Sequence, residues 1–214
     1  MNTYRAIRTA QTASAAGVRW FCYTSTGNVY APSLAPLAEG HPIRRDDPYA
    51  LSKLAAEEAL ALFGGRMPVL CPRLFGLFGP GQKQMLPANL LARIRSGQEI
   101  VLEPAPGENG EAEGLCVSFT YVADAARLLE ELALLALADK SLPRVLNMAG
   151  PEPISIRRFS VELGRVVGME PRFARAPTPR IHNLIADIGL LDTLLTPRWT
   201  PFSEAMAQSF GGTR

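Results

Sequence analysis

The sequence has few of the residues that build metal sites and disulfide frameworks. Only three cysteines and two histidines occur among its 214 residues. Cys22, Cys71 and Cys116 are far apart and lie in apolar stretches, so they predict neither a disulfide framework nor a zinc site. We expect them to pack as small apolar side chains in a reducing compartment. His41 and His182 alone give no basis for a histidine-rich metal site, so no metal is expected.

Long runs of one charge and long apolar runs are also absent. The 22 basic and 20 acidic residues are scattered and leave a net charge of +2. This pattern provides no electrostatic basis for binding nucleic acid or an anionic membrane surface. No apolar run approaches the roughly 20 residues that span a bilayer, and no signal peptide is recognisable. We therefore expect a cytoplasmic protein whose partners are small molecules, not nucleic acid or membrane.

Strand-like and helix-like stretches alternate along the chain. Strands are predicted at 18–23, 69–75, 100–102, 117–122 and 144–148, and helices at 2–16, 49–63, 86–96, 123–138, 155–167, 187–195 and 203–210. The first strand is apolar on both faces, as in a parallel sheet that helices cover on both sides. The glycine-rich stretches 76–81 and 106–114 are predicted as a turn and an irregular loop. The alternation predicts an α/β fold with a mainly parallel, doubly wound sheet.

One pair of residues carries a specific chemical signal. Tyr49 and Lys53 are four positions apart on a predicted helix that Asp47 caps and Pro48 begins, so they share one face. A lysine ammonium one turn away favours a phenolate, which makes a tyrosine useful as an acid or base. Thr26 follows the first strand, at the carboxyl end where open α/β sheets bind ligands. The alternative is a partly buried aromatic residue beside a surface cation.

Four stretches together resemble a known family. They are Phe21 to Tyr30 with its Thr24-Ser25-Thr26 run, the Tyr49–Lys53 YxxxK pair followed by Glu57, Pro72 to Gly81, and Ser118 to Asp124. In this order they resemble the extended short-chain dehydrogenase/reductases of the NAD-dependent epimerase/dehydratase family, over nearly the whole chain. The resemblance implies a partial Rossmann-like, doubly wound parallel sheet with a small C-terminal substrate lobe. The sheet is then expected mainly within 1–80 and 115–150, and the lobe within 81–114 and 151–214.

The resemblance also implies roles for individual residues. Tyr49 would be the general acid/base, and Lys53 would favour its phenolate and bind the nicotinamide ribose of NAD or NADP. Thr26 would hold the substrate oxygen. Thr24, Ser25 and Leu74 would line the nicotinamide pocket. The implied reaction is an epimerisation, dehydration or oxidoreduction at a hydroxyl or carbonyl carbon, and hydride transfer itself belongs to the cofactor.

Two positions depart from members that act on nucleotide sugars. Those members often have Asn where this chain has Gly76, and Arg where it has Val117. Both positions are substrate-binding candidates by resemblance, and the departures leave a nucleotide-sugar substrate open. The segment from Arg172 to Arg180 is interpreted either as a contact to an anionic substrate or as a surface loop.

A larger departure concerns the cofactor. Family members begin with a strand, a glycine-rich turn and a helix that hold the cofactor pyrophosphate, and this sequence contains no such motif. The strand at 18–23 is then expected to have an unpaired edge. We expect either a truncated or misassigned start, or a non-catalytic remnant that acts as a binding or partner-dependent module. The resemblance further implies a homodimer formed through helices 2–16 and 49–63.

Overall fold

A parallel sheet forms the centre of the molecule. The structure is a computed structural model that describes residues 2–65 and 67–212. The sheet contains β1 (Phe21–Cys22), β2 (Ser25–Thr26), β3 (Val69–Leu74) and β8 (Val145–Met148). β1 and β2 pair with successive parts of β3 on one side, and β8 pairs with β3 on the other. Within the described residues no strand pairs with the outer side of β1 and β2, so this edge is open, as the sequence led us to expect.

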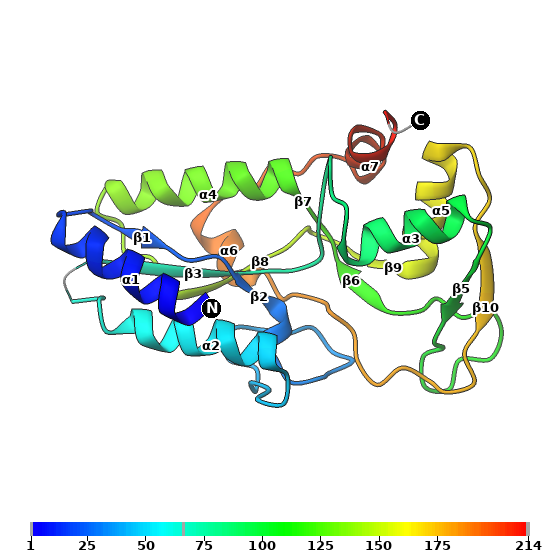
Figure 1. The fold of residues 1–214 in the computed structure, drawn as a ribbon, viewed down its shortest axis with the longest axis horizontal. Coiled ribbons are helices and arrows are strands. Elements are labelled where there is room, and N and C mark those ends of the chain that lie inside the picture. Colours follow the sequence, from blue (N-terminus) through cyan, green and yellow to red (C-terminus); the bar gives the residue numbers. More distant parts are fainter. Residues whose placement is uncertain (1, 66, 213–214) are drawn as a thin grey trace.

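Helices cover both faces of this sheet. Figure 1 shows α1 (Asn2–Ala15) and α2 (Pro48–Ala61) together on one face and α4 (Val122–Leu137) on the other. Successive β3 side chains point to opposite faces. Cys71 packs with Ala10 of α1 and Leu60 of α2, whereas Leu70 packs with Leu128 of α4. The short helix α6 (Gly189–Leu194) adds Leu191 to the α4 side. The apolar, two-sided strand pattern in the sequence follows from this burial.

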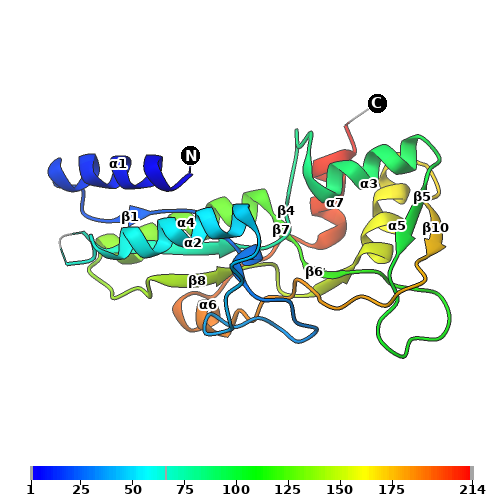
Figure 2. The ribbon, with the colours of Figure 1, turned by 60° about the horizontal axis from the view of Figure 1, so that its bottom comes forward.

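A lobe of smaller sheets and helices, which includes the C-terminal helix, lies at one end of the central sheet (Figure 2). It contains α3 (Met85–Arg95), β5 (Glu99–Leu102), β6 (Cys116–Ser118), β9 (Pro153–Ser155), α5 (Ile156–Val167), β10 (Arg172–Arg175) and α7 (Phe202–Phe210). β5 pairs with β10 in parallel and β6 with β9 in antiparallel orientation. Aromatic rings fill its core, with the Phe119 and Phe159 centroids 4.3 Å apart. The pair β4 (Leu77–Phe78) and β7 (Thr120–Tyr121) joins the lobe to the sheet.

The structure corrects several expected boundaries. The stretch 76–81, predicted as a turn, contains β4. The strand predicted at 117–122 is divided into β6 and β7, because its first part pairs with β9 and its second with β4. The first strand is shorter than predicted and resumes as β2, followed by a 3₁₀ turn at Gly27–Val29. β9 and β10 were missed, since each is short and pairs with a strand far away in the sequence.

In the part of the chain that the structure describes, no helix is long and apolar enough to cross a membrane. The same residues contain no cluster of three or more histidine, cysteine or acidic side chains placed to hold one metal ion. The three cysteines are all free thiols. Cys71 is buried, whereas Cys22 and Cys116 are partly buried.

Candidate active site

One pocket brings together every site residue predicted from the sequence. It has a volume of about 330 Å³, and its lining includes Thr24, Ser25, Thr26, Tyr49, Lys53, Leu74, Gly76 and Val117. The ends of β2 and β3 lie side by side there, since Thr26 is paired with Leu74. The pocket therefore opens at the carboxyl ends of the parallel strands, the edge at which α/β sheets bind ligands.

Thr26 is held by local backbone structure. It is buried and has extended backbone angles as the last residue of β2. Its Oγ accepts a hydrogen bond of 3.2 Å from the backbone N–H of Asn28, which caps the 3₁₀ turn at Gly27–Val29. Because the hydroxyl oxygen accepts this bond, its proton is left to donate to a ligand oxygen.

Tyr49 and Lys53 lie on the first turns of α2. The Asp47 carboxylate accepts a hydrogen bond from the backbone N–H of Ala50 at 2.7 Å, and Pro48 follows it at the first helical position. This cap fixes where the helix begins and so where Tyr49 stands. The Tyr49 side chain is 48% exposed, which leaves it accessible from the pocket.

The Lys53 ammonium is anchored on the strand side of the pocket. Its Nζ donates a hydrogen bond of 2.9 Å to the carbonyl oxygen of Thr24 and lies 4.8 Å from the centre of the Tyr23 ring. Burial lowers the pKa of Lys53, and the Glu57 carboxylate opposes that shift. For Tyr23, burial is the main cause that raises the pKa to about 12, with further contributions from Cys71 and others.

A buried polar network supports the pocket from below. The Ser25 hydroxyl donates a hydrogen bond to the Glu57 carboxylate. Arg73 donates two bonds to the same carboxylate, from Nη2 at 2.6 Å and from Nε at 3.1 Å. The Arg73 guanidinium also lies 4.7 Å from the centre of the Tyr30 ring, whose hydroxyl donates to Asn147 Oδ1 at 2.7 Å. The network connects α2 to β2, β3 and β8.

Some lining residues were missed from the sequence. They are mostly apolar and come from several segments: Asn28, Leu77, Met85, Leu86, Pro87, Leu115, Phe119 and Leu184. Arg73 and Glu57 were not predicted as supporting residues either. A charged residue inside an apolar strand or helix stretch is a signal for such a buried pair, because unpaired charges are very costly to bury.

The arginine-rich segment from Arg172 to Arg180 does not line the pocket. Its first four residues form β10, so the surface-loop interpretation was wrong for them. Arg175 donates hydrogen bonds to the carbonyl oxygens of Gly110 and Glu108, both at 2.6 Å. Arg180 is buried and donates to Asn183 at 3.0 Å. These guanidiniums stabilise the lobe.

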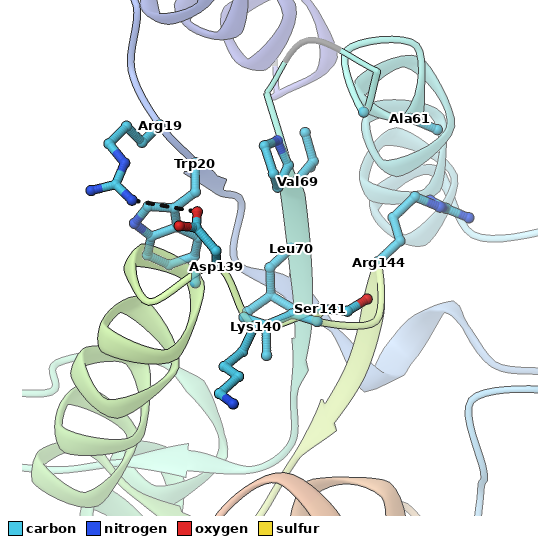
Figure 3. Close-up of a pocket in the computed structure, with 13 residues that line it drawn as sticks. Arg19, Trp20, Ala61, Val69, Leu70, Asp139, Lys140, Ser141 and Arg144 are labelled. Atoms are coloured by element: carbon cyan, nitrogen blue, oxygen red, sulfur yellow. Dashed lines mark hydrogen bonds and ion pairs between the residues drawn. The ribbon is translucent and has the colours of Figure 1, made fainter.

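A second cavity of about 400 Å³ lies at the opposite, amino-terminal ends of the strands. Figure 3 shows its basic side chains diverging: Arg19 meets Asp139, and Arg144 extends toward α2. Arg144 Nη1 donates to the carbonyl oxygen of Glu57 at 3.1 Å. Because its charged groups do not converge on a common point, this cavity is a weaker candidate than the pocket around Thr26.

Comparison with known families agrees with this geometry. Residues 2–149 match the profile described as the NAD dependent epimerase/dehydratase family. The chain belongs to this family. The matched region contains all eight predicted pocket residues. A comparison with curated proteins finds no match.

Solved structures share the Rossmann-like fold. MoeE5 in complex with UDP-glucuronic acid and NAD has a TM-score of 0.75 and 23% identity, covering 98% of this chain and 69% of MoeE5. The UDP-glucuronic acid 4-epimerase from Bacillus cereus in complex with NAD has a TM-score of 0.79 and 20% identity, covering 98% and 64%. TunA, an NAD-dependent NDP-hexosamine 5,6-dehydratase, has a TM-score of 0.77 and 24% identity, covering 98% and 68%. This chain spans about two thirds of their length.

Proposed function

We propose that this chain carries the catalytic groups of an NAD(P)-dependent epimerase, dehydratase or oxidoreductase that acts on a hydroxyl or carbonyl carbon. The observation that carries the proposal is the pocket at the carboxyl ends of β2 and β3, which Thr26, Tyr49 and Lys53 line together. Family membership supports nicotinamide chemistry at this place. The solved structures of MoeE5 hold UDP-sugars and NAD, which makes a nucleotide sugar one candidate substrate.

The proposed chemistry divides among three side chains. Tyr49 takes the proton from a substrate hydroxyl, or returns it to a carbonyl oxygen, as general base or acid. The Lys53 ammonium, one helical turn from Tyr49, would hold a ribose hydroxyl of the cofactor. The Thr26 hydroxyl donates a hydrogen bond to the substrate oxygen and keeps it beside Tyr49. The bound cofactor supplies the hydride exchange at the adjacent carbon.

The residues present fit one end of the cofactor. Thr24, Ser25 and Leu74 would face the nicotinamide, with Lys53 at its ribose. The glycines after β3 do not form a pyrophosphate cradle. A Cβ at Gly76 would come within 2.6 Å of a Val117 methyl group, and one at Gly79 within 2.2 Å of Val122. Side chains of this chain already fill those spaces, so these glycines serve close packing and not ligand approach.

A second candidate function is a binding module that completes its site with a partner. The open outer side of β1 and β2 favours it, because an unpaired strand edge offers backbone donors and acceptors to another strand. The two candidates differ in what the chain does alone. An enzyme binds its nicotinamide cofactor without a partner, whereas the module does not.

Titration calorimetry distinguishes the enzyme from the partner-dependent binding module. NAD(H) and NADP(H) are titrated into the purified chain and into Lys53→Met and Lys83→Met variants; Lys83 is exposed and does not line the pocket. We expect binding to the parent chain and to Lys83→Met and a loss for Lys53→Met. Tyr49→Phe is expected to bind cofactor normally and to lower turnover about 10²–10⁴-fold. No binding at millimolar cofactor would leave the partner-dependent module.

A further inference from the structure

Two chemical kinds of residue line the pocket. The polar ones are Thr24, Ser25, Thr26, Asn28, Tyr49 and Lys53, and among all the lining residues Lys53 carries the only charge. Leu74 lies beside Thr26. The remaining lining residues form what we call the apolar wall: Gly76, Leu77, Met85, Leu86, Pro87, Leu115, Val117, Phe119 and Leu184. A substrate whose oxygen lies beside Tyr49 is then expected to place its other atoms against this wall.

The centre of that wall is fixed by a contact between Gly76 and Val117. Gly76 has a φ of +46°, and an added Cβ would lie 2.6 Å from Val117 Cγ1 and 3.1 Å from Phe119 Cα. A side chain that could donate a hydrogen bond has no room at this position. Val117 is itself held in β6 by pairing with Ile154 and by a bridge to Leu184. The close approach of Gly76 to Val117 and Phe119 therefore leaves apolar groups at the centre of the wall.

Three arginines of the lobe make their contacts within the lobe and do not line the pocket. Arg175 and Arg180 make their hydrogen bonds within the lobe, and Arg157 pairs with Glu111 at 2.9 Å. Phosphate recognition in proteins relies mainly on such cations, and an anion placed on carbon without them loses its hydration.

We propose that the substrate carries an apolar alkyl or aryl group next to its reacting carbinol or ketone carbon, and that the wall around Gly76 and Val117 selects it over a phosphorylated sugar. This inference rests on the proposed function for the location of the reacting carbon. The pocket volume of about 330 Å³ lies at the lower end of the range for small-molecule sites. Because the nicotinamide would occupy part of this volume, the remaining space suits a small ketone or secondary alcohol.

The first turn of α3 is an element beside the wall that favours an anion. Gln84 precedes the helix and makes no side-chain capping hydrogen bond, so the first backbone N–H groups are uncapped by that residue. A UDP-sugar whose phosphates use this turn is the competing occupant. The test therefore contains both ligand classes.

The experiment measures binding, not turnover. Dissociation constants are determined by saturation-transfer NMR for a homologous series of straight-chain methyl ketones, for acetophenone and for UDP-glucose, on the purified chain without cofactor. We expect affinity to rise by up to about fourfold per added methylene until the wall is covered. UDP-glucose is expected not to displace the ketones. Tighter binding of UDP-glucose, absence of a chain-length effect, or no ketone binding each overturns the inference.

Two variants test whether the apolar wall causes the dependence of ketone affinity on chain length. Leu86 lines the pocket and is 37% exposed, so Leu86→Gln is expected to fold and to weaken ketone binding by several-fold. Leu134→Gln on α4 is the matched control, because Leu134 is exposed and lies outside the pocket. Equal effects of the two would contradict the assignment. Because ketone binding is measured without cofactor and without turnover, a failure of the proposed catalysis and a failure of this selectivity give different results.

Discussion

The Glu57 carboxylate and the Arg73 guanidinium form a buried ion pair directly beneath the candidate active site, with Nη2 2.6 Å from Oε2. Their side chains are 1% and 5% exposed. Glu57 also accepts the hydrogen bond of Ser25, and Lys53, one helical turn earlier, is bonded to the Thr24 carbonyl. Two successive turns of α2 are thus attached to the two residues that precede Thr26. The pair sets the position of the catalytic helix against β2.

Breaking this pair is expected to destabilise the fold strongly. Glu57→Ala leaves the Arg73 guanidinium buried without its partner, and such losses cost about 3–5 kcal/mol. Urea unfolding measures the change. The neighbouring Glu58→Ala is the control, since Glu58 is exposed and lies 4.0 Å from Arg45, a contact worth at most about 1 kcal/mol. The double variant Glu57→Leu with Arg73→Met should lose less than Glu57→Ala; an equal or larger loss would show that the charge pairing is not the cause.

The thiols predict a decline of stability at alkaline pH. Burial raises the pKa of Cys22 from 9.0 to about 11 and is the main cause that raises that of Cys71 to about 12. Below pH 9 the thiols are protonated in both states and do not affect the equilibrium. Above pH 9 the unfolded chain ionises first, so the free energy of unfolding falls as the pH rises toward 11.

The measurement is urea unfolding at a series of pH values for the parent chain and for Cys22→Ala with Cys71→Ala. We expect the double variant to show a shallower decline above pH 9. An identical slope in both proteins would assign the decline to other groups, such as Tyr23, whose pKa is also raised. At neutral pH the folded chain is expected to react slowly with thiol reagents at Cys22 and Cys71, because thiolates are the reactive form.

A homodimer through α1 and α2 remains a prediction, and the structure indicates which surface to test. Leu51, Ala55, Glu58 and Leu62 are spaced four, three and four residues apart and therefore follow one stripe of the α2 region. Leu51 is 43% exposed, and Leu62, at the C-cap of the helix, is 86% exposed. Light scattering at micromolar concentration is expected to give twice the 23.2 kDa chain mass.

Leu51→Glu together with Leu62→Glu should convert this dimer to monomer, because two added charges in each copy would face the leucines of the other copy. Leu134→Glu on α4 is the control, since it places the same charge on an exposed leucine of the opposite face. A monomeric parent chain refutes the prediction directly.

The sequence predicted the elements whose signals are local. The helix around Tyr49 follows from Asp47 and Pro48, and it starts where those residues require. The strand at 69–75 was recognisable because both of its faces are buried and its residues are apolar. In contrast, β9 and β10 are three and four residues long and depend on partners outside their own neighbourhood. Period and composition contain no information about such pairings.

The residues of the site also differ in how far the sequence predicted them. Thr26, Tyr49 and Lys53 were predictable, because they occur within short motifs that resemble the family. Leu115 and Leu184 were not, because they are separated by almost seventy positions and are brought together only by the folded lobe. Glu57 entered the sequence analysis only through the family resemblance, and only the structure shows that it meets Arg73.

The bond between Lys53 and the Thr24 carbonyl has a consequence for ligand binding. A lysine side chain free in solution has about 2 kcal/mol of rotamer entropy to lose when it becomes ordered. Here that ordering occurs during folding, because Nζ is held 2.9 Å from a carbonyl oxygen of the chain itself. A nucleotide or substrate that contacts Lys53 thus binds to an ammonium group whose side chain is already ordered. Its association is accordingly less opposed by entropy, because this part of the pocket is preorganised.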